Sequence, residues 1–270
     1  MRYILNTYNY TKDRTIIVEN LLINEHERVD NLHLDGYKII QNTQHFRYGV
    51  DAVLLSWFAG QRVFKNAKII DLGTGTGIIP ILLVANEKCI HVDAIEIQDY
   101  YADLASRNIK LNNLQNYINV TQGDIRNLSE VSINPKYDIV VSNPPYMKGS
   151  IHNEKLPHAI ARHEITWSME ALMVTARKIL KDRGKLIFIH RASRLVDIIY
   201  NMRANGIEPK VMRLVTPKLS KDPNLVLIEG HKNGKAQLTV EKPIVIYNEN
   251  GDYTDELKDI YYNSKKPISL

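Results

Sequence analysis

From residue 68 onward, short runs of β-branched and other apolar residues alternate with stretches whose apolar residues recur at helical spacing. Helices are expected over residues 77–86, 99–113 and 168–180. The apolar runs that predict strands span residues 68–72, 92–97, 118–122, 137–142, 184–190, 211–216 and 225–231. This alternation is typical of a parallel sheet with helices on both faces. It predicts an α/β, doubly wound fold with a seven-stranded, mostly parallel sheet.

The first 66 residues show a less regular pattern and carry two local signals. Apolar runs between residues 31 and 40 predict a hairpin that turns at Asp35 and Gly36. Residues 52–59 predict a short apolar helix. Neither an internal repeat nor a low-complexity linker divides the chain. We therefore expect an N-terminal extension packed on one main domain, followed by a C-terminal tail, with the bounds 1–66, 67–247 and 248–270.

Composition and cysteine content narrow the class of protein. The 270 residues are 44% hydrophobic and 24% charged, which is usual for a globular chain and argues against disorder. The longest apolar run, residues 78–85, is shorter than the roughly 20 residues that a membrane-spanning helix needs. The single cysteine, Cys89, cannot form an internal disulfide or by itself build a zinc or iron–sulfur site. Because the N-terminus also lacks the apolar core of a signal peptide, we expect a cytoplasmic protein.

Positive charge is concentrated in the later part of the chain. Residues 67–150 carry 7 Lys and Arg against 9 Asp and Glu, whereas residues 151–270 carry 20 against 14. Twelve basic and three acidic residues fall within the basic stretch, residues 177–221. Such a stretch suggests a polyanionic partner, and a solvated helix face is the alternative explanation.

Three glycines follow the first predicted strand, in the sequence Asp71-Leu72-Gly73-Thr74-Gly75-Thr76-Gly77. Glycine in such a loop lets a nucleotide-like ligand approach the backbone at the start of the next helix. Glu96 follows Gly77 by 19 residues at the end of the next strand, and Asp124 with Ile125 follows the third strand. Ligands of doubly wound sheets bind at the carboxyl ends of the strands, so these residues predict a nucleotide-type cofactor. The glycine spacing differs from the G-x-G-x-x-G of dinucleotide enzymes.

These residues resemble the class I S-adenosylmethionine-dependent methyltransferases, whose first motif reads D/E-x-G-x-G-x-G. The resemblance covers residues 68–231 and implies a Rossmann-like fold. It also implies that residues 71–77 cradle the methionine and ribose of S-adenosyl-L-methionine. Glu96 would then hold the ribose diol, and Asp124 and Ile125 would meet the adenine. The slightly acidic middle third of the chain suits a cationic sulfonium.

The fourth predicted strand ends in Asn143-Pro144-Pro145-Tyr146. A residue before proline is driven out of the helical region, so Asn143 and Pro144 are held extended. The Asn143 side-chain oxygen and the Pro144 carbonyl oxygen can then accept both hydrogens of one exocyclic amine. These acceptors stabilise the charge that builds on the nitrogen as a methyl group arrives, and no charged base is needed. Tyr146 can stack on a base swung out of its own stack, and a structural Pro-Pro turn is the alternative.

This tetrapeptide resembles the motif of amino methyltransferases, which methylate adenine or cytosine amines or a glutamine amide. Residues 44–55, 71–80 and 161–164 resemble the bacterial family of tRNA1(Val) (adenine(37)-N6)-methyltransferases, although enzymes that act on ribosomal RNA or protein share much of this pattern. In that family context, Phe46, Tyr48 and Asp51 would close over the methionine end of the cofactor. The alternative is that Asp51 caps the following helix and both aromatic side chains lie in the core.

The polar segment after the tetrapeptide has a length typical of functional or mobile loops. Its Arg162, His163 and Glu164 could order this loop, touch an RNA backbone or lie on the surface. The spacing of His152, His158 and His163 fits no compact metal site, so we expect no metal.

The resemblance implies transfer of a methyl group from S-adenosyl-L-methionine to the N6 amine of an adenine in tRNA, with S-adenosyl-L-homocysteine as product. The loop 147–164 and the basic stretch would contact the tRNA. Two alternatives keep the chemistry, namely N6 methylation of ribosomal RNA and N5 methylation of a glutamine in a translation factor. The glycine spacing disfavours a dinucleotide-dependent oxidoreductase. The complete set of site residues disfavours a noncatalytic RNA-binding module.

Overall fold

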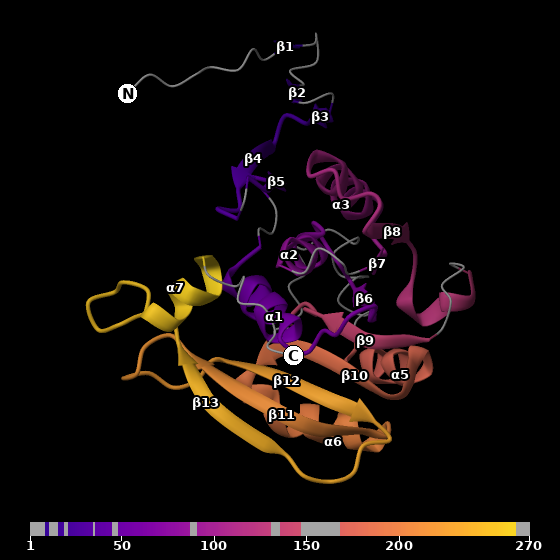
Figure 1. Cartoon of the computed structure of the whole chain (residues 1–270), viewed down its shortest axis with the longest axis vertical. Coiled ribbons are helices and arrows are strands. Elements are labelled where there is room, and N and C mark those ends of the chain that lie inside the picture. The colour runs from indigo at the N-terminus through magenta and orange to yellow at the C-terminus, as the bar shows by residue number, and fades with distance from the viewer. Residues whose placement is uncertain are drawn as a thin grey trace, which may run out of the picture.

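An eight-stranded, mostly parallel sheet runs through the protein, with the strand order β13-β11-β12-β10-β9-β6-β7-β8 (Figure 1). The computed structural model describes residues 9–10, 16–18, 21–34, 36–44, 48–86, 91–130, 136–146 and 168–262. β12 is antiparallel to its neighbours β10 and β11, and the other pairings within this sheet are parallel. The predicted doubly wound α/β fold is confirmed.

The predicted strands and helices all correspond to observed elements. The strands of the large sheet are β6 (Lys68–Leu72), β7 (His91–Glu96), β8 (Ile118–Gln122), β9 (Tyr137–Ser142), β10 (Leu180–Arg191), β11 (Ile207–Thr216), β12 (Leu225–Lys232) and β13 (Thr239–Val245). The helices are α1 (Val50–Gly60), α2 (Ile78–Asn86), α3 (Asp99–Leu111), α5 (Met169–Ile179), α6 (Leu195–Ala204) and α7 (Asp255–Tyr262), with short 3-10 helices at Ile125–Glu130 and Ala192–Arg194.

The predicted count of seven strands is wrong by one, because β13 extends the sheet beyond β11. Only Ile244 of this edge strand is buried, so its sequence lacks the apolar run that marks the inner strands. Pro243 also interrupts the strand pattern, and proline is tolerated in a sheet chiefly at an edge, where a missing N–H costs no ladder hydrogen bond.

The inner strands bury alternate residues in two separate hydrophobic cores. Ile69 and Ile187 pack with α1 and α2 on one face, whereas Ile70 and Phe188 pack with α5 and α6 on the other. This two-sided burial explains why these strands are apolar throughout rather than alternating apolar with polar residues. No helix in the described part of the chain has the length and apolarity needed to cross a membrane.

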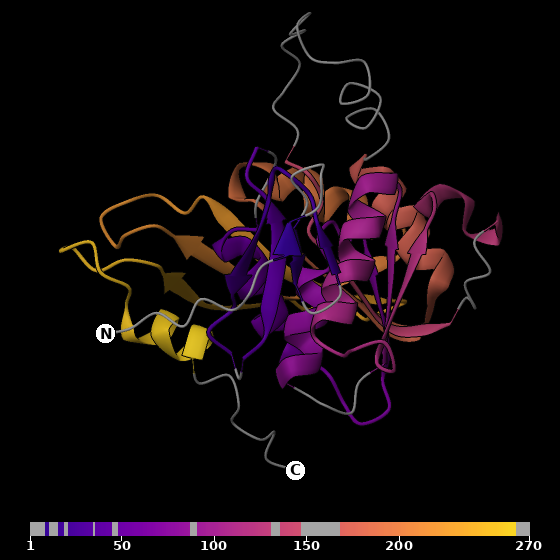
Figure 2. The same cartoon turned by 90° about the horizontal axis from the view of Figure 1, so that it is seen from above.

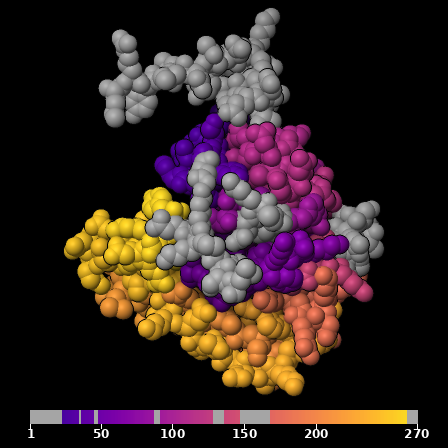
Figure 3. All heavy atoms as spheres, viewed as in Figure 1, coloured from indigo at the N-terminus to yellow at the C-terminus, as the bar shows by residue number. Residues whose placement is uncertain are grey.

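The N-terminal region contains the predicted hairpin, formed by β4 (Glu27–Asn31) and the antiparallel β5 (Lys38–Asn42). The short strands β1 (Asn9–Tyr10), β2 (Ile16–Val18) and β3 (Leu21–Ile23) form a separate antiparallel sheet before it. In Figure 3 the indigo hairpin and the magenta α3 region form one continuous surface. A buried ion pair joins the two, with Arg107 Nη1 of α3 lying 2.7 Å from Glu27 Oε2.

Asn108, which is fully buried on α3, connects the hairpin to the loop after β6. Its side-chain oxygen accepts a hydrogen bond from the Ile40 N–H (2.6 Å). Its amide nitrogen donates to the carbonyl oxygens of Ile40 (3.1 Å) and Thr76 (2.9 Å). One side chain therefore fixes the backbone of β5 and of the glycine-rich loop at the same time.

Residues 255–262, within the segment predicted as a tail, form the helix α7. Leu257 and Ile260 of α7 are buried in the same hydrophobic core as α1. Figure 2 shows α7, in yellow, on the side of the molecule opposite to the magenta strands β7 and β8. The amphipathic spacing of Leu257 and Ile260 explains why this segment folds onto the domain.

Candidate active site

The loop between β6 and α2 is shaped by its three glycines. Gly73, Gly75 and Gly77 have φ angles of 74°, 57° and 80°, a region that favours glycine. The N–H groups of Gly73 and Thr74 donate to the Ile95 carbonyl oxygen at 2.9 and 3.0 Å, which holds the loop against β7. A Cβ at Gly77 would lie 3.3 Å from the Ala105 Cβ of α3, whereas one at Gly75 would meet nothing within 4 Å. The loop is thus packed at Gly77 and open at Gly75.

Two buried polar side chains beside this loop lack protein partners. Neither carboxylate oxygen of Asp71, nor the Thr74 hydroxyl, has a hydrogen-bond partner among the described residues. Burial raises the pKa of the Asp71 carboxyl to about 7, and the charge of Glu96 adds to the rise. The nearby Thr74 hydroxyl lowers the pKa of Asp71, although the two side chains do not meet the geometry of a hydrogen bond. Buried unpaired groups of this kind are costly, so they are suited to receive donors or positive charge from a ligand.

Glu96 ends β7 and faces the same loop. Its Oε2 accepts the Gly75 N–H at 2.9 Å, and its Oε1 accepts the Gln98 N–H at 3.0 Å. Two backbone donors on one buried carboxylate fix the side chain at the carboxyl edge of the sheet. The structure therefore brings together Asp71, Thr74, Gly75 and Glu96, as the sequence predicts.

Asp124 and Ile125 follow β8 at this edge, and Ile125 begins the first 3-10 helix. The guanidinium of Arg126 donates from Nε to both Asp124 oxygens, at 3.0 and 2.9 Å, and thereby lowers the pKa of that carboxyl. The Ile125 side chain is buried, and its carbonyl oxygen accepts the Thr175 hydroxyl at 3.2 Å. Asp124 is thus held ionised and partly exposed at the rim of the glycine loop region.

The tetrapeptide Asn143 to Tyr146 leaves β9 directly beside the glycine loop. The hydroxyl of Ser142 donates to the Leu72 carbonyl oxygen at 2.9 Å, which ties the end of β9 to the end of β6. Pro144 is buried, Pro145 is exposed, and Asn143 is partly exposed. Asn143, Pro144 and the glycine loop therefore meet at one edge of the sheet, where parallel α/β folds bind ligands.

Tyr146 lies in a cluster that the sequence did not predict. Its hydroxyl lies 3.1 Å from Asp51 Oδ2 and 3.2 Å from Asn143 Oδ1. Its ring meets the His190 ring edge-on at 5.5 Å, and the Arg191 guanidinium lies 4.7 Å above its centroid. Burial and the charge of Asp51 raise the pKa of the Tyr146 hydroxyl, so it stays protonated. His190 and Arg191 lie at the end of β10, which is the parallel neighbour of β9. Because parallel neighbours end at the same edge of the sheet, the position of these residues in the sequence could have predicted that they lie near Tyr146.

Asp51 lies in the first turn of α1 and does not cap the helix, whose N-cap residue Gly49 has no side-chain cap. Its Oδ1 accepts the N–H of the adjacent Ala52 at 2.9 Å. One carboxylate oxygen thus contacts the first turn of α1, and the other faces Tyr146.

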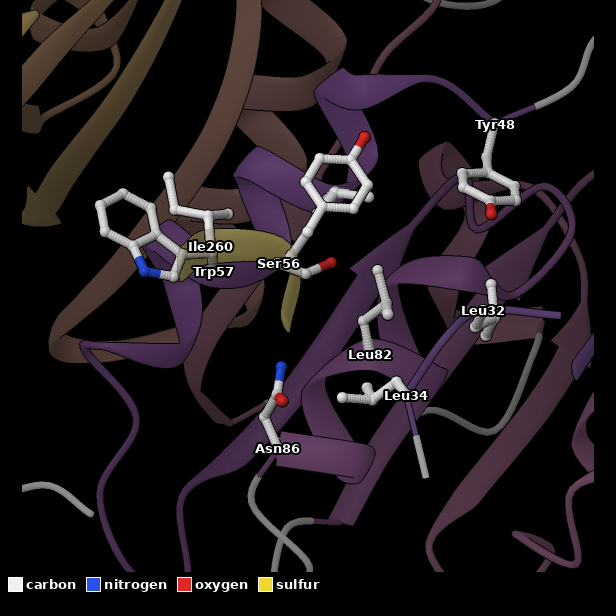
Figure 4. A pocket seen from close by; sticks show the side chains of 10 residues that line it. Leu32, Leu34, Tyr48, Ser56, Trp57, Leu82, Asn86 and Ile260 are labelled. Carbon is white, nitrogen blue, oxygen red and sulfur yellow. The ribbon is translucent and has the colours of Figure 1, made fainter. Parts of the chain in front are cut away.

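Tyr48 lines a different cavity, shown in Figure 4 between the N-terminal hairpin, α1, α2 and α7. The other lining residues are Leu32, Leu34, Val53, Ser56, Trp57, Leu82, Asn86, Ile260 and Tyr261. Burial raises the pKa of the Tyr48 hydroxyl. None of Asp71, Thr74, Glu96 and Asp124 lines this cavity. Phe46, Cys89, His152, His158 and the loop residues Arg162, His163 and Glu164 lie outside the described residues.

The basic stretch does not form one surface. β10 and β11 run in the same direction, because each is antiparallel to β12, so their starts and ends lie at opposite edges of the sheet. Arg191, Arg194, Lys218 and Lys221 lie at or just beyond the carboxyl ends, at the edge that carries Asn143. At the opposite edge, the Lys181 ammonium pairs with Asp138 at 2.7 Å. Only part of the basic stretch is therefore placed to meet a substrate at the tetrapeptide.

A family model for the methyltransferase small domain matches residues 49–197. The fold and this match define a class I S-adenosylmethionine-dependent methyltransferase. More particularly, the chain belongs to the methyltransferase small domain family.

Sequence relatives and a solved structure agree with this assignment. A tRNA1(Val) (adenine(37)-N6)-methyltransferase from Porphyromonas gingivalis is 31% identical over 82% of this chain and 84% of its own length. A relative of the same name from Parabacteroides distasonis is 32% identical over 80% of this chain and 90% of its own length. A solved structure of a predicted O-methyltransferase from Agrobacterium tumefaciens has the same fold, with a TM-score of 0.63 and 20% identity, covering 80% of this chain and 96% of that one.

Proposed function

We propose that this enzyme methylates the N6 amine of an adenine in tRNA, at position 37 of tRNA1(Val), and that it works in the cytoplasm. The observation that carries the proposal is the position of Asn143 and Pro144, at the end of β9, where Ser142 bonds to the last residue of β6, just before the glycine loop. The names of the two relatives support adenine in tRNA as the acceptor.

The residues beside the glycine loop fit S-adenosyl-L-methionine, which supplies an electrophilic methyl group on a cationic sulfonium when it is bound. The unpartnered Asp71 carboxylate and Thr74 hydroxyl offer polar contacts, and open space at Gly75 leaves room for close approach. Glu96 would hold the ribose hydroxyls, and Asp124 with Ile125 would meet the adenine. We leave Tyr48 out of this set because it lines the separate cavity.

Asn143 and Pro144 would orient the acceptor amine. An amine conjugated to a purine ring is a weak nucleophile, because its lone pair is delocalised into the ring. The side-chain oxygen of Asn143 and the carbonyl oxygen of Pro144 accept its two hydrogens, which turns the lone pair toward the methyl group and stabilises the developing positive charge. The Tyr146 ring would stack on the displaced adenine on the face that Arg191 does not cover.

The tRNA backbone would lie along the carboxyl edge of the sheet, where Arg191, Arg194, Lys218 and Lys221 offer positive charge. Adenine in an exposed anticodon loop is already unpaired, so displacing it costs little. The loop 147–164 follows the tetrapeptide and is part of the same proposed contact.

Incubation with labelled S-adenosylmethionine and, separately, total tRNA, total ribosomal RNA and translation factors tests the proposal. We expect label in N6-methyladenosine of tRNA and a steep loss of tRNA binding as salt rises. A tRNA1(Val) transcript without adenine at position 37 should not be labelled. A transcript with a substitution in the acceptor stem instead should be labelled as the unchanged transcript is. Label in a protein glutamine or only in ribosomal RNA would overturn the substrate.

The affinity for S-adenosylmethionine is expected to rise with pH up to about 7. The Asp71 carboxyl, whose pKa is raised to about 7, holds a proton below that pH. A bound cation favours the ionised form, so binding releases this proton and weakens by up to about tenfold for each pH unit below 7. Calorimetric titrations between pH 5.5 and 8.5 measure the effect. Asp71→Asn should remove this dependence, and an unchanged pH profile in that variant would rule out Asp71 as its source.

A further inference from the structure

The contacts of the Tyr146 hydroxyl define which way its hydrogen points. Asp51 Oδ2 and Asn143 Oδ1 lie 3.1 and 3.2 Å from this hydroxyl, but a tyrosine has one hydrogen to donate. A carboxylate is the stronger acceptor, because its hydrogen bonds are charge-assisted. The hydrogen therefore goes to Asp51, and the hydroxyl oxygen is left as an acceptor toward Asn143.

If the Tyr146 hydroxyl oxygen is an acceptor, the Asn143 amide must donate the hydrogen bond between them. The oxygen and the NH2 group of an amide have nearly the same shape, so the hydrogen-bond partners decide which of them faces Tyr146. The structure has Oδ1 at 3.2 Å from the Tyr146 hydroxyl. With the hydroxyl oxygen as acceptor, the amide takes the flipped orientation, in which the NH2 group faces Tyr146 and Oδ1 points the other way. The reverse orientation would present NH2 to the incoming amine, itself a donor, and would remove the acceptor on which methyl transfer depends.

We propose that Asp51 is a positioning residue that acts through the Tyr146 hydroxyl to hold the Asn143 amide with Oδ1 toward the acceptor nitrogen. This inference rests on the proposed function of the tetrapeptide, and it assigns Asp51 to the acceptor side of the site instead of the methionine end of the cofactor. It connects the Gly49-Val50-Asp51 segment at the start of α1 with a motif 92 residues later in the chain.

The surroundings keep the Asp51 carboxylate in place. Asp51 is 9% exposed, and its Oδ1 is fixed by the Ala52 N–H at 2.9 Å. A Cβ on Gly49 would lie 2.9 Å from that oxygen, so glycine at this position leaves the carboxylate its room. The helix behind it is anchored by the fully buried Leu54, Leu55 and Phe58. A rigid acceptor is what an orienting contact requires.

A double-mutant cycle tests the proposal. Tyr146→Phe and Asp51→Ala should each slow single-turnover methylation of a tRNA1(Val) transcript by about 3- to 10-fold, the size of one hydrogen bond. The variant with both substitutions should be no slower than the slower single variant, because both remove the same orienting contact. Effects that multiply would show that the two residues act independently and would overturn the proposal.

Two further measurements separate positioning from other roles. Asp51→Asn keeps an oxygen that can accept the tyrosine hydrogen but loses the charge that makes position 51 the preferred acceptor, so its rate should lie between those of Asp51→Ala and the wild type. The Kd for S-adenosylmethionine should be the same in all variants, and a matched loss of cofactor affinity in Asp51→Ala would assign Asp51 to the cofactor instead. Thermal melting identifies any variant that has lost its fold, and Asp51→Asn then carries the test.

Failure of the proposed function is distinguishable from failure of this inference. A wild-type enzyme that leaves tRNA unlabelled contradicts the substrate, and the cycle is then measured on the ribosomal RNA or translation factor that accepts the label. The orienting contact requires only that the nitrogen that receives the methyl group carries N–H hydrogens. The same non-additive result is therefore expected with either of these substrates.

Discussion

Replacing Asn143 by alanine is expected to slow methyl transfer by about 100- to 1000-fold, while the affinity for S-adenosylmethionine stays within about threefold. The substitution removes the acceptor that stabilises charge on the amine nitrogen during transfer. It leaves Asp71, Thr74 and Glu96 intact beside the glycine loop. Single-turnover rates at saturating cofactor and calorimetric binding of S-adenosylmethionine measure the two quantities separately.

Asn119→Ala is a matched control for this prediction. Asn119 is an exposed asparagine on β8 whose amide donates to Asp93 at 3.3 Å. Its loss should change neither the rate nor the cofactor affinity by more than about twofold. An equal loss of rate and cofactor affinity in Asn143→Ala would contradict the role in orienting the amine.

Glu27→Ala is expected to lower the free energy of unfolding by about 3 kcal/mol, because it removes the carboxylate that two nitrogens of the buried Arg107 guanidinium bind. Arg107 Nε keeps its carboxylate partner, Asp103 at 2.7 Å. Glu27 accepts Arg107 Nη1 and Nη2 at 2.7 and 2.8 Å and the Tyr100 hydroxyl at 2.9 Å. Burial by itself raises the pKa of Glu27, but these hydrogen bonds outweigh burial and lower it to about 2. Urea unfolding followed by circular dichroism measures the change.

Arg28→Ala in the same strand provides the control for the buried pair. Arg28 pairs with Asp30 at 2.9 Å and is half exposed, so its loss should cost no more than about 1 kcal/mol. Similar losses in the two variants would mean that the hairpin is held by its apolar contacts rather than by the buried pair. Since the folded pKa of Glu27 is below its ordinary value, this stabilisation is present at neutral pH and is lost as the pH falls toward 2.

The sequence predicts the strands best where burial on both faces demands an uninterrupted apolar run. β6 and β9 have the bounds that the apolar runs indicate. The edge strand β8, in which only Ile118 is buried, was predicted from its β-branched residues. β13 lacks such a run because it lies at the edge, and α6 was hidden because its buried Ile198 and Met202 alternate with charged and exposed residues. Burial on both faces made the inner strands recognisable, whereas at the sheet edges only β-branched residues, as in β8, could indicate a strand.

The part of the candidate site that lies at the ends of the parallel strands was predictable from the sequence. The rule that ligands bind at the carboxyl ends of parallel strands predicts that Asp71, Glu96 and Asn143 meet. It does not predict that Asp51, from a helix outside the strand succession, contacts Tyr146 95 residues away. The sequence also did not predict that the residues of the basic stretch are divided between two edges of the sheet by β10 and β11. A count of charges along the chain does not say at which edge each residue lies.

The amide of Asn108 makes the N-terminal hairpin and the glycine loop energetically dependent on each other. It holds Ile40 of β5 and the Thr76 carbonyl oxygen at the same time, so neither backbone can shift without breaking a buried hydrogen bond. Coupling free energy between two sites is reciprocal. Occupancy of the glycine loop should thus tighten the hairpin by as much as the ordered hairpin tightens binding at the loop, which makes the hairpin a thermodynamic part of the cofactor site.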